Sequence, residues 1–114
     1  AVDVGARIGA VLKRWHAPVF VLASNDMTHF APAERAREQD QKAIARMEAL
    51  DAAGLLATAR RERITMCGAQ PVAAMLAATG VLGARRGELV GYANSAAISG
   101  DESDVVAYAG VVVE

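Results

Sequence analysis

The sequence contains little cysteine and few aromatic residues, and both shortages limit what it can be. One cysteine among 114 residues cannot form an internal disulfide. A lone cysteine suits a reducing compartment, so we expect a cytoplasmic protein. Aromatic residues make up only 4%, whereas hydrophobic residues make up 54%, and many of these are alanine. A core of this composition is large enough for one domain and requires close packing through small side chains.

Neither sign of charge dominates, and no apolar run is long. The 12 basic and 13 acidic residues give a net charge of −1, so nothing indicates binding to nucleic acid or to an anionic membrane surface. The longest apolar run, Val105 to Val113, is far shorter than the ~20 residues of a membrane-spanning helix. No basic start precedes an apolar segment, so we expect no signal peptide. Without repeats or linkers, residues 1–114 are expected to form one unit.

The spacing of apolar residues predicts an α/β chain. Helices are expected over about 2–16 and 32–50. A third, shorter helix is expected after a cap at Asp51, and a fourth from Pro71 to Gly80 or Gly83. The all-apolar segment 19–24 is typical of a strand buried on both faces of a parallel sheet. GELVGYANS and SDVVAYAGVVV predict two strands, and the turn-rich AAISGDES between them predicts a hairpin.

A polar pair follows the predicted strand. The stretch ASNDMTHFAP presents Asp26 and His29 at the carboxyl end of residues 19–24, where open α/β sheets bind their ligands. An imidazole can carry protons or bind metal, and a nearby carboxylate can fix its tautomer. The alternative makes Asp26 a turn residue and His29 a neighbour of the next helix. The spacing alone leaves both interpretations open.

Cys67 is a second candidate. It lies in ITMCGAQPV, just before a predicted helix whose first backbone N–H groups favour a thiolate. Such a thiolate could bind metal or act as a nucleophile. The alternative is a small core residue, which is the commoner role of an isolated cysteine.

Taken in order, four segments resemble the Memo family, whose bacterial and archaeal members are called AmmeMemoRadiSam system protein B. They are VLASNDMTHF, ALDAAGL, RITMCGAQPVAAML and LVGYANSAAISGDESDVVAYAG, and the resemblance covers essentially the whole chain. Memo proteins are similar in fold to class III extradiol dioxygenases, which are non-haem iron enzymes. The resemblance therefore implies a sheet flanked by helices, of which residues 1–114 form only the carboxyl-terminal half.

The resemblance also assigns roles to the candidate residues. Cys67 matches a metal-ligating cysteine, His29 a second-sphere histidine that acts as acid or base, and Asp26 a residue of the pocket wall. A thiolate favours iron or copper(I), with zinc a further candidate, over magnesium or calcium. We therefore expect part of a mononuclear metal pocket and metal-dependent redox or dioxygenase-like chemistry on a small organic substrate.

The departure from the family pattern concerns the other metal ligands. The family takes two histidines from the amino-terminal half, which this chain does not resemble. We therefore expect a fragment of a longer chain, or a separate polypeptide that supplies the other half, and self-association through the face that half would cover. The family name implies an AMMECR1-type protein and a radical S-adenosylmethionine protein as further partners.

Two other functions remain open at this point. In the first, Cys67 is the nucleophile of a hydrolase, activated by His29 and oriented through Asp26. In the second, the protein is a non-catalytic adaptor for anionic or phosphorylated peptide, with the arginines around 60–63 as contacts.

Overall fold

Five helices and three strands make up the computed structural model, which describes residues 1–114. Their order is α1 (Val2–Leu12), β1 (His29–Ala31), α2 (Ala33–Glu48), α3 (Ala52–Arg61), α4 (Ala69–Val81), β2 (Gly87–Asn94), α5 (Ala96–Ser99) and β3 (Val105–Val113). None of the helices is both long and apolar enough to cross a membrane. The chain is of mixed α/β class, as the sequence predicts.

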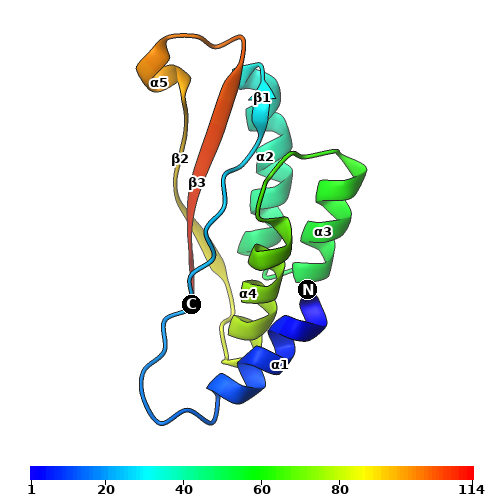
Figure 1. Cartoon of the computed structure of the whole chain (residues 1–114), viewed down its shortest axis with the longest axis vertical. Helices are drawn as coiled ribbons and strands as arrows, with labels where there is room; N and C mark the ends of the chain where they lie inside the picture. The colour runs from blue at the N-terminus through cyan, green and yellow to red at the C-terminus, as the bar shows by residue number, and fades with distance from the viewer.

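The three strands form an antiparallel sheet in the order β1-β3-β2. The long strands β2 and β3 pair from Gly87↔Val113 to Asn94↔Ala107, and α5 lies in the connection between them (Figure 1). This confirms the predicted hairpin. The short strand β1 pairs with the start of β3, at His29↔Val106 and Ala31↔Val105. Pairing with β3 therefore fixes the backbone at His29.

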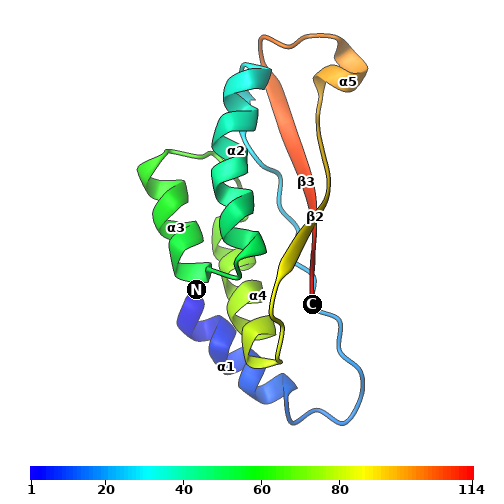
Figure 2. The ribbon, with the colours of Figure 1, turned by 180° about the vertical axis from the view of Figure 1, so that it is seen from behind.

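The four longer helices lie on one face of this sheet (Figures 1 and 2). Helix α2 packs against β2 and β3, α3 packs against α2 and α4, and α4 packs against α1. Strand β3 alternates accordingly, with Val105 and Ala107 buried under the helices and Tyr108 and Val112 exposed on the other face. The expectation of a sheet flanked by helices therefore holds for one face only.

The predicted helices α2 and α3 are confirmed. Residues 33–48 carry an apolar stripe that repeats at helical spacing, and its members are buried: Ala36, Ala43, Ile44 and Met47. Asp51 caps α3, as expected, because its Oδ1 accepts a hydrogen bond of 2.8 Å from the Gly54 N–H. Helix α4 begins at Ala69, two residues before the proline predicted to start it, and ends at Val81.

Three details of the sequence prediction are wrong. The first helix ends at Leu12 and not near residue 16. Residues 19–24 form no strand and make no backbone–backbone hydrogen bond, and the large side chains of Phe20 and Leu22 are exposed. The sheet is antiparallel and not parallel. Hydropathy marks the segment as apolar, but a strand also needs a hydrogen-bonded neighbour. The bonds to β3 begin only at Met27 and Thr28, which pair with Ala107, and continue into β1.

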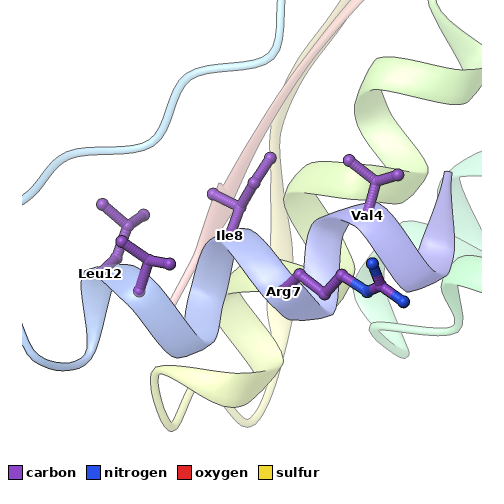
Figure 3. A pocket seen from close by; sticks show the side chains of 5 residues that line it. Val4, Arg7, Ile8 and Leu12 are labelled. Atoms are coloured by element: carbon purple, nitrogen blue, oxygen red, sulfur yellow. The ribbon is translucent and has the colours of Figure 1, made fainter.

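The outer side of helix α1 is an apolar surface. Val4, Ile8, Val11 and Leu12 line a shallow hollow on its outer side, with Arg7 at the edge (Figure 3). The opposite side of α1 packs tightly on α4 through Gly5 and Gly9, where any larger side chain would meet the backbone of Ala74 or Ala78. Contact with α4 therefore buries only one side of the helix, and its apolar outer side faces solvent.

Candidate metal centre

The structure brings together the three residues that the sequence singles out. One ligand atom each from Asp26, His29 and Cys67 forms a group in which all three atoms lie within 4.8 Å of one another. Asp26 lies on the segment that leads into β1, His29 is the first residue of β1, and Cys67 lies on the segment that leads into α4. The other histidine, His16, follows the end of α1 and is not part of this group.

Hydrogen bonds hold the two segments side by side. The Cys67 N–H donates to the Asp26 carbonyl at 3.3 Å, and the Asp26 N–H donates to the Cys67 Sγ at 3.3 Å. The Asn25 side-chain oxygen accepts from the Gly68 N–H at 2.6 Å. Cys67 is exposed, and its sulfur accepts a hydrogen bond from a backbone N–H. Cys67 is therefore no core residue, contrary to the alternative that the sequence left open.

The ring of His29 is fixed by Thr65. Its Nδ1 lies 2.9 Å from the Thr65 carbonyl oxygen, which can only accept, so Nδ1 carries the proton. The His29 N–H also donates to the Thr65 Oγ1 at 2.8 Å. The remaining ring nitrogen, Nε2, lies 3.8 Å from the Asp26 Oδ2. A lone pair on Nε2 thus faces the group, where an imidazole nitrogen can carry a proton or bind a metal ion.

A buried carboxylate that the sequence analysis did not identify supports this segment. Asp40 of α2 is fully buried, and its Oδ1 accepts from the Thr28 N–H at 3.1 Å and from the Thr28 hydroxyl at 2.7 Å. Its Oδ2 accepts from the Tyr92 hydroxyl at 2.8 Å. Burial and this hydrogen bond to a carboxylate raise the pKa of Tyr92 well above its ordinary value. Asp40 thereby ties α2, β2 and the residue before His29 together.

One signal in the sequence could have found Asp40. It lies four residues after Ala36 and four before Ile44, so it falls on the apolar stripe of α2 and not on its charged face. A carboxylate at an inward position needs hydrogen-bond donors, and the donors here come from Thr28 and Tyr92.

The donor set fits a transition-metal ion. Sulfur, imidazole nitrogen and carboxylate oxygen are the ligands of zinc, iron and copper sites, with bond lengths of about 2.0–2.3 Å. Ligand atoms on one ion are then about 3–4 Å apart, so a group within 4.8 Å requires only a small inward movement of side chains. Since Cys67 is exposed and Asp26 half-exposed, side-chain rotation can supply that movement.

Nearly the whole chain is similar in sequence to a known protein family. The model of the family described as Memo-like protein matches residues 1–112. The chain belongs to the Memo-like protein family. It is 42% identical to a MEMO1 family protein of Methanopyrus kandleri over 110 residues, which are 96% of this chain and 39% of that protein. It is 40% identical to a MEMO1 family protein of Methanosarcina acetivorans over all 114 residues, which cover 43% of that protein. A MEMO1 family protein of Aquifex aeolicus is 42% identical over 112 residues, or 98% of this chain and 41% of the relative.

This Memo-like chain spans about two-fifths of the length of the curated relatives it matches. The family and the mixed α/β class are thus established, together with a group of three residues able to hold a metal ion.

Proposed function

We propose that this chain contributes Cys67, His29 and Asp26 to a mononuclear metal pocket, and that the complete protein carries out redox or dioxygenase-like chemistry on a small organic substrate. The observation that carries the proposal is the convergence of the three ligand atoms from two segments that are 41 residues apart in the chain. A bound iron or copper ion would supply electron transfer or oxygen activation.

The roles follow from the contacts of each side chain. Cys67 is the metal ligand, because its exposed sulfur is a soft donor held beside a backbone N–H. His29 holds or moves a proton at Nε2, because Nδ1 is occupied by the Thr65 carbonyl. Asp26 places a carboxylate oxygen 3.8 Å from Nε2, beside the proton-carrying nitrogen. Thr65, and not Asp26, holds the imidazole in place through Nδ1.

The same residues could serve a cysteine hydrolase, but the contacts of Cys67 favour the metal. A nucleophilic thiol needs its base within hydrogen-bond reach. The sulfur of Cys67 instead has the Asn25 side-chain oxygen and the Asp26 carbonyl as acceptors at 3.9 Å, and no hydrogen bond joins it to His29. Stoichiometric metal in the complete protein supports the metal pocket, whereas full hydrolytic activity after chelation would support the nucleophile.

The remaining metal ligands are proposed to come from the amino-terminal half of the same fold. In support, the matched relatives are more than twice as long as this chain. Three apolar surfaces are available for that half: the outer side of α1, the segment 19–24, and the open face of the sheet at Val90, Tyr108 and Val112. An AMMECR1-type protein and a radical S-adenosylmethionine protein are proposed partners of the complete protein.

The test compares the chain alone with a reconstituted pair. The partner is the portion of a full-length relative, such as that of Methanosarcina acetivorans, that this chain does not match. Alone, the chain should self-associate through its apolar surfaces and bind iron or copper weakly, without a fixed stoichiometry. The pair should elute as a single species with one metal ion. A monomeric chain that holds one metal ion tightly by itself would refute the need for a second half.

A further inference from the structure

A polar hollow that His29 helps to line lies between the start of α2 and the segment that follows α3. Its volume is about 210 Å³, and His29, Thr65, Gln39, Phe30, Arg35 and Arg63 are among the residues that line it. No aspartate or glutamate lines it, so the two guanidinium groups give it a positive charge. The hollow is smaller than the ~300–1,000 Å³ pockets that hold drug-sized ligands, so it suits one functional group or a small molecule.

The two arginines are not used in ion pairs. Neither Arg35 nor Arg63 has a carboxylate within 4.0 Å. A second hollow, between α2 and α3, shows the contrast, because its cations are all paired. Its residues Lys42 and Arg61 bind Glu62, and Arg46 binds Asp51. Unpaired guanidinium groups that converge on a concave surface are suited to bidentate recognition of a carboxylate or phosphate.

The backbone around the hollow is held in an uncommon conformation. Phe30 and Arg63 adopt positive φ angles of 60° and 53°, which residues other than glycine seldom do. Phe30 is 74% exposed and lines the hollow, and its ring lies edge-on to the His29 ring at a centroid distance of 5.9 Å. An exposed aromatic ring beside two arginines offers an apolar surface to the body of an organic anion.

We infer that this hollow binds the anionic group, a carboxylate or a phosphate, of the small organic substrate whose reacting part lies at the metal pocket. The inference rests on the proposed function, and His29 is the link, because its ring belongs to both the metal-binding group and the lining of the hollow. Arg35 and Arg63 would bind the charge, and Phe30 would cover the apolar body. A molecule held in this way would extend past the His29 imidazole toward Cys67.

The test is a titration of the reconstituted pair, in which only the 114-residue chain carries ¹⁵N, with sodium phosphate and, separately, with sodium benzoate, at constant ionic strength. Saturable changes in the backbone amide chemical shifts should appear at Phe30, Arg35 and Arg63. Because a hydrogen bond between charged groups contributes about 1.5–3 kcal/mol, Arg35→Gln and Arg63→Gln should each weaken binding by about 10-fold or more. The matched control is Arg60→Gln, which removes an unpaired arginine of α3 that does not line the hollow and should change the affinity less than about twofold.

Each outcome decides the inference. A tighter complex with benzoate or with phosphate identifies the class of the anion. The inference is overturned if neither anion gives saturable shifts, if Arg60→Gln weakens binding as much as the other two variants, or if only a phosphorylated peptide binds. Metal content of the reconstituted pair separates this result from the proposed function. The Arg35 and Arg63 variants should keep their metal, so loss of anion binding alone overturns only the inference, whereas a pair without metal would overturn the proposed function.

Discussion

Replacement of Asp40 by alanine should destabilise the fold strongly, because two of the three donors that Asp40 satisfies are deeply buried. The Thr28 N–H and hydroxyl both donate to Oδ1, at 3.1 and 2.7 Å, and Thr28 is only 2% exposed. Water cannot replace the carboxylate at these two donors. The Tyr92 hydroxyl donates to Oδ2 at 2.8 Å, but Tyr92 is half-buried, so its hydroxyl can bind water after the substitution.

The magnitude follows from the two buried donors. Each buried donor left without an acceptor costs about 1–3 kcal/mol, so Asp40→Ala should lower the free energy of unfolding by about 2–6 kcal/mol. That is a large part of the ~5–15 kcal/mol that stabilises an ordinary domain. Asp40→Asn should cost less, about 1–2 kcal/mol. Its amide oxygen can still accept from Thr28, and the Tyr92 hydroxyl can turn to accept from the amide nitrogen.

Urea unfolding, followed by circular dichroism, measures these differences as shifts of the transition midpoint at constant slope. Asp3→Ala is the matched control, because the Asp3 side chain is 80% exposed and forms only a surface pair with Arg7. It should change the free energy of unfolding by less than about 0.5 kcal/mol. A loss below about 1 kcal/mol for Asp40→Ala, or a loss equal to that of Asp3→Ala, would refute the role assigned to Asp40.

Three further predictions concern single side chains. Burial, with the hydrogen bond to Asp40, raises the pKa of Tyr92 above its ordinary value of 10.0, so the unfolded chain ionises first. The stability that this difference provides is present below about pH 10 and is lost as the pH rises further. Tyr92→Phe should therefore flatten the alkaline part of a plot of the free energy of unfolding against pH. An unchanged plot would contradict the assignment. The Thr58 hydroxyl is buried without a partner, so Thr58→Val should raise the free energy of unfolding by about 1 kcal/mol in urea titration, and a loss would show that the hydroxyl is satisfied. In the reconstituted pair, His29→Ala should leave the metal content unchanged and reduce turnover by about 10²–10⁴-fold, whereas metal loss equal to that of Cys67→Ser would make His29 a ligand.

Local patterns in the sequence were sufficient for the elements that depend on local interactions. The apolar stripe of α2, the Asp51 cap of α3 and the hairpin of β2 and β3 were all predictable from residue types within a few positions. Residues 19–24 were not, because a strand depends on a distant backbone partner. In this structure the hydrogen bonds to the partner strand β3 begin only at Met27, after the apolar segment has ended.

The candidate site, too, was predictable from the sequence only in part. Asp26, His29 and Cys67 could be named from their residue types and from the resemblance to a family, and the structure places their ligand atoms together. The contribution of Thr65 could not be predicted, because its contact with the His29 ring uses a backbone carbonyl, which every residue carries. Asp40 could have been found from its inward position on α2, but its partners Thr28 and Tyr92 lie 12 and 52 residues away in the chain.

The metal content of the reconstituted pair, with Cys67 intact and with Cys67→Ser, tests the proposed metal pocket most directly. Serine nearly matches cysteine in size but is a poor ligand for iron, copper or zinc, and the exposed position of Cys67 lets the fold tolerate the change. We expect close to one metal ion per pair with Cys67, and a large loss of metal with Cys67→Ser while the circular dichroism spectrum and the elution volume stay the same. Equal metal content in the two proteins would contradict the account, because the ion would then be held without Cys67.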